Sequence, residues 1–414
     1  MGLPMTAGIP ADDDVLAPGA ARVRALLCAE NFLVAFGVGA FLTLPLAIKS
    51  RGLDEIFFGQ VFAAGAIGAL LCAGTSSWLL RRFGLAAVAP WGSGTFCAGS
   101  VVLAACMARP DTGPGWYLGS VLQGMGWGLF LTQGPICLST IVSAKRRAYH
   151  LMIYGAFNTL GIGLAPLASR WALDVARWHF IDLFVVGSAA SGLACIASVL
   201  AAWRNPAYRH ATPPADGAGR RPALRAVLGL PSVWFLAMVF LCACVYTSMM
   251  NFQTTLAAAR HIDYAVFYGA YMLAVVAARF GLSGPLSKLP PSTTVPAFAV
   301  LMAAALVLLC AASASVVAYA LGALALGIAY GLLYPTIQAQ AAGYAPAALR
   351  SQALIAFSLS YLFARYLFPY AGARIIAIGG YDALLGTLVV VAVVNTAIAF
   401  AFYRIGPGRT TATA

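Results

Sequence analysis

The sequence has little charge and very few acidic or histidine side chains. Only 9% of its 414 residues are charged, with 12 acids and 4 histidines, while 62% are hydrophobic. Soluble domains carry about 25% charged residues. A chain with so little charge would aggregate in water, and its mean hydropathy of +0.87 points the same way. The scarcity of charge therefore excludes a soluble protein and predicts an integral membrane protein.

The sequence also lacks the motifs of common enzymes and pumps. It contains no metal-ligand spacing, no nucleophile elbow and no phosphate-binding loop with its lysine. Cys242 and Cys244 share one predicted helix. Residues two positions apart on a helix point about 200° apart, so these thiols cannot bind one ion together. We therefore predict no enzymatic activity, no ATP-driven pumping, no cofactor and no metal site.

Long apolar runs make up most of the chain. Each is about 20 residues long, which predicts membrane-spanning helices rather than the shorter alternating strands of a barrel. A polar stretch rich in Pro, Gly and Arg, residues 204–226, lies between the sixth run and the seventh and predicts a flexible linker. The twelve predicted spans lie near residues 25–47, 58–80, 86–107, 116–142, 149–169, 180–203, 229–256, 265–287, 295–315, 317–343, 351–378 and 382–403.

The predicted fold is all-α, an integral membrane protein with twelve transmembrane helices in two six-helix bundles. We divide the chain into an N-terminal tail (1–24), a first bundle (25–203), a linker (204–228), a second bundle (229–403) and a C-terminal tail (404–414). The polar, acidic first 21 residues lack the basic and apolar regions of a cleaved signal peptide, so we expect none.

Basic residues indicate the orientation. With the N-terminus in the cytoplasm, the cytoplasmic segments carry 16 lysines and arginines and the opposite side carries 7. Because basic residues collect in cytoplasmic loops, we expect both termini in the cytoplasm and a location in a bacterial-type inner (plasma) membrane. The same loops account for the net charge of +13. We therefore expect the lipid bilayer, and no nucleic acid, as a partner.

Two internal repeats relate the halves. The stretch from Gly124 to Pro166 aligns without a gap on the stretch from Gly327 to Pro369, at a constant offset of 203 positions. The aligned pairs include Gly124 with Gly327, Gly128 with Gly331, Arg147 with Arg350 and Pro166 with Pro369. The loop sequence Arg51-Gly-Leu-Asp54 returns as Arg260-His-Ile-Asp263 at an offset of 209. Related halves are the way in which many transporters build a site near the middle of the bilayer.

With these features the chain resembles the major facilitator superfamily of secondary transporters, over about residues 25–403. The family motif after the second span, Gly-x-x-x-Asp-Arg-x-Gly, here ends Arg81-Arg82-Phe-Gly84. The matching element of the second half runs from Gly284 to Lys288. In both halves a base replaces the acid that latches the cytoplasmic side in the family.

Two further motifs contribute to the resemblance. The span-4 motif Arg-x-x-Gln-Gly lacks its arginine and reads Ser120-Val-Leu-Gln123-Gly124. The span-5 antiporter motif is partly preserved as Gly161-Ile-Gly163-Leu-Ala-Pro166. The resemblance implies that motif and helix residues take part in the conformational change, namely Arg81, Arg82, Gly84, Arg279, Lys288, Pro166 and Pro369.

Three ionisable side chains, Glu30, Arg279 and Arg365, lie within predicted spans and away from their ends. A charge there costs at least about 2.5–3.5 kcal/mol on insertion scales, so each needs a partner or a water-filled cavity. We interpret Arg365 either as a cation for an anionic substrate group or as a buried partner of a carboxylate or of carbonyls near Pro369. Arg279 either binds substrate or braces its helix. Glu30, the only acid away from the ends of the predicted spans, either carries a proton or pairs with a basic residue at the cytoplasmic rim.

Uncharged polar side chains complete the candidate site. In the family that the chain resembles, spans 1, 4, 7 and 10 line the central cavity. For each residue, helix packing through its amide is the competing interpretation. The predicted substrate-binding residues are Asn31, Gln123, Gln133, Asn251, Gln253, Tyr334 and Gln338, together with Arg365; Thr132, Tyr330, Gln340 and Asn158 are similar cases.

We predict a secondary active transporter that moves a small organic solute by alternating access. The partly preserved motif around Gly163 and Pro166 favours efflux. Protons are the predicted coupling ion and a monomer the predicted state. One alternative is an uptake permease for an anionic metabolite or a siderophore-like ligand, with Arg365 as its anchor. A second alternative is a membrane sensor that has lost transport.

Overall fold

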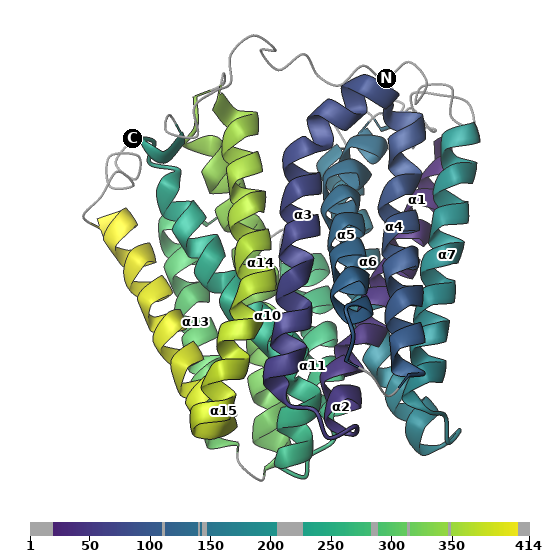
Figure 1. The fold of residues 1–414 in the computed structure, drawn as a ribbon. Helices are drawn as coiled ribbons and strands as arrows, with labels where there is room; N and C mark the ends of the chain where they lie inside the picture. Colours follow the sequence, from purple (N-terminus) through teal and green to yellow (C-terminus); the bar gives the residue numbers. More distant parts are fainter. Residues whose placement is uncertain are drawn as a thin grey trace, which may run out of the picture.

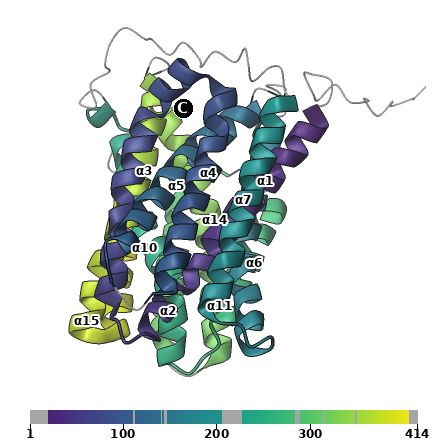
Figure 2. The same cartoon turned by 45° about the vertical axis from the view of Figure 1, so that its right-hand side comes forward.

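The computed structural model describes residues 20–109, 112–139, 141–142, 147–204, 227–282, 289–312, 315–346 and 349–404. In these ranges the chain folds into long helices and contains no strand. The helices run nearly parallel to one another, and the helices of the first half lie beside those of the second (Figures 1 and 2). This arrangement confirms the all-α prediction.

The first half forms one bundle. Within it, α4 packs against α5 and α7, α3 packs against α5, and α1 packs against both α6 and α7. Its first span is continuous from Ala20 to Lys49, because α1 passes through a short 3-10 turn into α2. The helices are α1 (Ala20–Ala40), η1 (Phe41–Thr43), α2 (Leu44–Lys49), α3 (Glu55–Phe83), α4 (Leu85–Met107), α5 (Gly115–Ser139), α6 (Arg147–Asp174) and α7 (Phe180–Arg204).

The second half repeats this plan. Within it, α13 packs against α14 and α15, α11 packs against α14, and α10 packs against α15. The long helix α15 contains a break at Gly380, where φ is 73° and ψ is −173°, so it forms two spans. The helices are α10 (Val233–Ala259), α11 (Tyr264–Ala277), the π-helical segment η2 (Ala278–Leu282), α13 (Pro291–Ala311), α14 (Val316–Gly343) and α15 (Arg350–Arg404).

These helices confirm the twelve predicted spans. Within the described residues, ten helices are long and apolar enough to cross a membrane, and the last of them contains the break at Gly380. The remaining span is α5, whose many glycines lower its hydropathy. Its 25 residues still extend about 37 Å, enough for a hydrocarbon core of about 30 Å. Most of the predicted linker and tails lie outside the described residues, so the exact divisions at 203 and 229 stay predictions.

The repeated loop has the same structure in both halves. Asp54 caps α3 by accepting a hydrogen bond from the Phe57 amide, and Asp263 caps α11 by accepting one from the Ala265 amide. Two residues earlier, Gly52 and His261 have positive φ angles of 76° and 56°. These positions correspond in the alignment. Shared caps and a shared left-handed residue are strong evidence that the halves are related.

The arginine of each repeated loop also has the same role. Arg51 donates to the carbonyl of Met107 at 2.9 Å, at the end of α4. Arg260 donates to the carbonyl of Leu309 at 2.7 Å, near the end of α13. The last carbonyls of a helix lack intrahelical partners, and a cation is favourable there. Each arginine therefore ties the first loop of its half to the third span.

Glycines allow two helix pairs to approach closely. A Cβ atom at Gly124 of α5 would lie 2.0 Å from the carbonyl oxygen of Gly65 in α3. A Cβ atom at Gly327 of α14 would lie 2.5 Å from the carbonyl oxygen of Tyr271 in α11. Membrane helices pack through small residues because apolar side chains gain nothing by leaving lipid. The aligned glycines Gly124 and Gly327 thus allow the same close contact between helices in each half.

Adding one methyl group at Gly124 should destabilise the protein. Overpacking costs typically 1–3 kcal/mol, so we expect Gly124→Ala and Gly327→Ala to lower the thermal unfolding temperature in detergent, read by intrinsic fluorescence. Gly74→Ala is the matched control, because nothing lies within 4 Å of its added Cβ. Equal unfolding temperatures for Gly124→Ala and Gly74→Ala would contradict this account of the packing.

Candidate functional site

A cavity of about 400 Å³ lies between the two halves. Small-molecule sites have volumes of roughly 300–1,000 Å³. Helices α1, α5 and α6 of the first half and α10, α11, α14 and α15 of the second half form its wall. The described aromatic side chains on the wall are Trp127, Phe130, Tyr154, Tyr246, Tyr268, Tyr271, Tyr330, Tyr334 and Tyr361. The described polar side chains on it are Asn31, Asn158, Thr159, Arg279 and Gln338.

Arg279 is the charged side chain among the described residues of the wall. It lies in the π-helical segment η2, a conformation that is frequent at functional sites. Its Nη1 lies 3.1 Å from Thr159 Oγ1 and 3.4 Å from the Gly155 carbonyl, both in α6 of the other half. Its Nε lies 3.4 Å from the Gly331 carbonyl. Arg279 therefore connects the two halves at the edge of the cavity.

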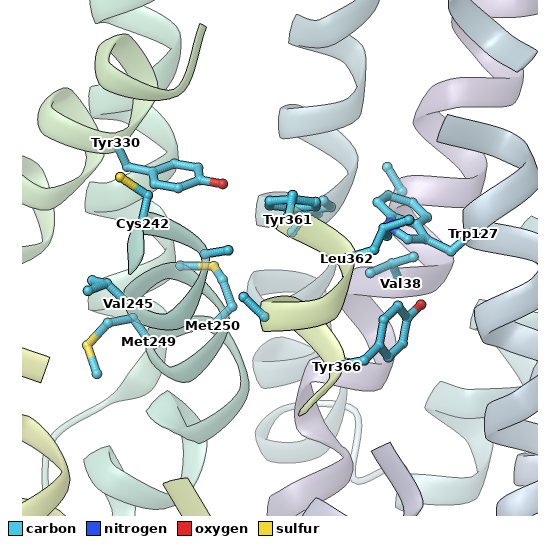
Figure 3. Packing of buried hydrophobic residues seen from close by; sticks show 14 of the residues in the cluster. Val38, Trp127, Cys242, Val245, Met249, Met250, Tyr330, Tyr361, Leu362 and Tyr366 are labelled. Carbon is cyan, nitrogen blue, oxygen red and sulfur yellow. The ribbon is translucent and has the colours of Figure 1, made fainter. Parts of the chain in front are cut away.

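Tyrosines of the second half stack along the cavity. The rings of Tyr246 and Tyr330 are parallel within 9°, with centroids 4.5 Å apart. Tyr334 lies 5.9 Å from Tyr330 and 5.5 Å from Tyr361, between centroids. Tyr361 and Trp127 lie on facing helices of the two halves (Figure 3). Of these residues the sequence prediction included Tyr330 and Tyr334, and it missed Tyr246, Tyr361 and Trp127.

Amide side chains of the first half form a second polar element. Asn158 Nδ2 donates to Asn31 Oδ1 at 2.9 Å, and Asn31 Nδ2 donates to the Tyr154 carbonyl at 2.5 Å. This chain of hydrogen bonds joins α1 to α6 on the cavity wall. Gln338 of α14 lies on the wall from the opposite half. The structure thus brings Asn31, Asn158, Tyr334 and Gln338 together.

Other predicted amides lie away from the cavity wall. Gln123 donates at 2.9 Å to a serine of α4, and Gln253 accepts a hydrogen bond of 2.6 Å from a tyrosine of α14. Asn251 donates to a carbonyl of its own helix at 2.8 Å. Gln133 is buried in α5 and is not among the wall residues. The recorded contacts of Gln123, Gln253 and Asn251 are those of helix packing within one half.

Glu30 is buried inside the first bundle. Ser93 of α4 donates a hydrogen bond to Glu30 Oε1 at 3.2 Å, and Ser198 of α7 lies beside the carboxyl group. No ion pair of Glu30 occurs among the described residues. At the rim, Arg24 lies 3.4 Å from a ring nitrogen of His150. Glu30 therefore points away from the cavity wall, although its neighbour Asn31 is part of that wall.

Arg365 lies directly behind the cavity wall and is only 6% exposed. Its guanidinium carbon is 5.1 Å from the centre of the Trp127 ring, and Nη1 is 3.4 Å from the hydroxyl of Tyr361. Pro369 has no N–H, so it leaves the Arg365 carbonyl without its helical donor. Thr247 Oγ1 supplies that donor at 2.8 Å. Thr247 thus holds the backbone of Arg365 in the turn before the proline, and Trp127 lies beside its guanidinium group.

The predicted motif residues lie at helix ends and interfaces. Gly84 has a φ of 79° and connects α3 to α4, a conformation that favours glycine. Arg81 and Arg82 are exposed in the last turn of α3, where cations are favourable. Pro166 lies within α6. Lys288 lies outside the residues that the structure describes.

Partly exposed polar groups join the halves at the far face, the face opposite the chain ends Ala20 and Arg404 (Figure 1). There, Lys49 Nζ lies 2.9 Å from Glu55 Oε1, and the hydroxyl of Tyr381 donates to the same oxygen at 2.6 Å. Arg170 Nε lies 3.0 Å from Asp263 Oδ1. Such exposed pairs are worth about 0.2–1 kcal/mol each. These contacts therefore hold the two halves together only weakly at the far face.

Twelve spans in two related halves around a central cavity define a multi-pass membrane transporter. The sequence profile described as Major Facilitator Superfamily matches residues 27–321, well over half of the chain. The chain therefore belongs to the major facilitator superfamily of secondary transporters. The sequence matches no curated protein.

Solved structures show the same fold. A POT family transporter in complex with 5-aminolevulinic acid is 15% identical, with a TM-score of 0.71 over 92% of this chain and 96% of that chain. The nucleoside transporter NupG is 14% identical, with a TM-score of 0.67 over 92% and 98%. The human organic anion transporter MFSD10 is 13% identical, with a TM-score of 0.65 over 92% and 100%. Similarity at this level of identity establishes the fold.

Removing the far-face contacts should open that face more often. We expect the double variant Arg170→Gln and Glu55→Gln to increase labelling of a cysteine at Thr254, which is fully buried, several-fold. The reagent is a membrane-impermeant maleimide added at the far face, in a background whose native cysteines are replaced. The control is Asp382→Asn, which breaks the ion pair with Arg260 inside the second half. Equal labelling of the double variant and this control would contradict the role of the far-face contacts.

Proposed function

We propose that the protein carries a small organic anion across the membrane by alternating access. In this mechanism the two halves rock about the central cavity and expose it to one side at a time. One observation carries the proposal: the described wall contains Arg279, tyrosine hydroxyls and amides, and it contains no acidic side chain. Arg365 lies directly behind the wall and adds a second positive charge.

The charge of the site favours an anion over a cation. Two unit charges 4 Å apart interact by about 4 kcal/mol at an effective dielectric constant of 20. A cationic cargo beside Arg279 would meet repulsion of that order, and an anion would meet a similar attraction. The site therefore supports the anionic alternative over export of cationic amphiphiles.

The size and surface of the cavity narrow the cargo further. Its volume of about 400 Å³ is near the lower end for small-molecule sites and suits a metabolite better than a siderophore-like ligand. Tyrosine rings and the thioethers of Met250 and Met272 supply apolar contact. The cargo therefore combines an acidic group with an apolar body.

Glu30 supplies a route for proton coupling. A membrane potential that is negative inside opposes the entry of an anion by about 2.3 kcal/mol per charge and 100 mV. A proton that enters with the anion cancels that charge. Among the described residues Glu30 is the only acid away from the ends of the spans, and the hydroxyl of Ser93 donates to its carboxyl group. We therefore propose uptake by proton–anion symport through an inner membrane with cytoplasmic termini. Export, favoured by the motif around Gly163, is the alternative direction.

Replacing Arg279 tests the anionic cargo. We expect Arg279→Gln to reduce both carboxylate-induced thermal stabilisation and carboxylate uptake into proteoliposomes at least tenfold, because the wall loses its charge. Arg374→Gln should change neither, since Arg374 is exposed and contacts Tyr370 of its own helix. Stabilisation by tetraphenylphosphonium but by no carboxylate would overturn the anion proposal. Carboxylate binding without uptake would identify a sensor.

Replacing Glu30 tests the coupling. We expect Glu30→Gln to abolish carboxylate accumulation driven by an inward proton gradient, while exchange of labelled for unlabelled carboxylate at equal pH continues. Asp382→Asn is the matched control, because Asp382 is an exposed acid whose ion pair with Arg260 lies inside the second half. Accumulation that still follows the proton gradient in Glu30→Gln would show that another group carries the proton. Outward movement driven by the same gradient would establish export.

A further inference from the structure

Arg365 is a buried cation, and the described residues around it stabilise its positive charge only in part. Its Nε has no hydrogen-bond partner, its contact with Tyr361 is long at 3.4 Å, and its other polar neighbours are the uncharged hydroxyls of Tyr246 and Tyr366. Its guanidinium lies over the rings of Trp127 and Tyr366, at 5.1 and 5.9 Å from their centres. No acid forms an ion pair with it among the described residues.

These contacts offset only part of the cost of burying the charge. Removing an ion from water costs several kcal/mol in a protein interior. A cation–π contact returns about 0.5–2 kcal/mol. Glu30 does not supply the missing charge, because its recorded hydrogen bond is to Ser93 inside the first bundle. An anion beside Arg365 would complete the site.

Trp127 provides a second unused donor at the same place. It is 3% exposed, lies on the cavity wall, and its indole Nε1 has no acceptor. A buried donor without a partner costs about 1–3 kcal/mol. The guanidinium of Arg365 lies over the indole ring of Trp127, so the two donors without acceptors belong to neighbouring side chains. Trp127 and Tyr361 lie toward each other from the two halves (Figure 3).

The two arginines lie at different interfaces between the halves. Arg279 lies where α11 meets α6, through Thr159 and Gly155. Arg365 lies in α15, which packs against α3, and its guanidinium contacts Trp127 of α5. Tyr246 lies near both guanidinium groups, on the wall of the same cavity. One cation thus lies on the cavity wall and the other directly behind it, each at a contact between the two halves.

Given that the protein carries organic anions, we propose that its cargo is an organic dianion. One acidic group binds Arg279, and the other binds a subsite made by the Arg365 guanidinium and the Trp127 indole N–H. A monoanion leaves one cation without its counter-charge, so it binds more weakly. The dianion would therefore bind at the contact near Arg279 and at the contact near Arg365, and both contacts lie between the two halves.

Matched pairs of carboxylates test this proposal on the purified full-length protein. The probes are benzoate with terephthalate and pentanoate with glutarate, and the measurement is the Kd at neutral pH by calorimetry in detergent. We expect each dianion to bind the native protein at least tenfold more tightly than its monoanion. Arg365→Gln and Arg365→Lys should remove this advantage, and size-exclusion chromatography should show that both variants remain folded.

A tryptophan variant separates the subsite from general packing. Trp127→Phe keeps a ring beneath Arg365 but removes the N–H, so it should weaken terephthalate and glutarate binding several-fold and leave benzoate and pentanoate binding unchanged. Trp116→Phe is the control, because Trp116 lies in the same helix and packs against Phe57, away from the cavity. It should change no Kd.

Three results would overturn the proposal. They are equal Kd values within each pair for the native protein, a dianion advantage that survives in Arg365→Gln, and no effect of Trp127→Phe. If monoanions bind as tightly as dianions and depend on Arg279, anion transport stands and the dianion proposal fails. If no carboxylate binds, both proposals fail.

Discussion

Every backbone hydrogen bond of the membrane spans has to be made within the protein, because the hydrocarbon core of a bilayer offers no water. Continuous helices meet that requirement almost everywhere. Two exceptions lie at or beside the central cavity. Pro369 frees a carbonyl that Thr247 satisfies, and the π-helical turn that contains Arg279 lies on the cavity wall. These two departures from ideal helix therefore lie where the two halves meet, and each involves a polar side chain.

The sequence predicts the spans, their number and the relation of the halves, because these depend on composition and on repeats that survive as single residues. It predicts cavity residues less well. Asn31 and Gln123 are both amides within apolar spans, yet one lies on the wall and the other packs against α4. Glu30 and Asn31 are neighbours whose side chains diverge by about 100° around the helix. Side-chain direction depends on how the helices are rotated, and a span that is apolar all round gives no signal for that rotation.

Aromatic residues on the cavity wall are also difficult to predict from the sequence. Tyr246, Tyr361 and Trp127 line the cavity, but in an apolar span they have the same appearance as core residues. Only the structure shows whether their polar atoms have hydrogen-bond partners, and this distinguishes a cavity residue from a core residue. For Trp127 and Arg365, donors without acceptors give that information. The halves also differ in chemistry despite their shared plan, because the second supplies the arginines and most of the tyrosines, and the first supplies Asn31 and Asn158.

The far face and the helix interfaces respond differently to the surrounding solution. The ion pairs of Arg170 with Asp263 and of Lys49 with Glu55 are partly exposed, so dissolved salt reaches them. Exposed charges are screened over about 8 Å at physiological ionic strength. The glycine contacts between α5 and α3 carry no net charge and are insensitive to salt. Ionic strength at the far face therefore weakens these polar contacts, and it leaves the glycine contacts inside each half unchanged.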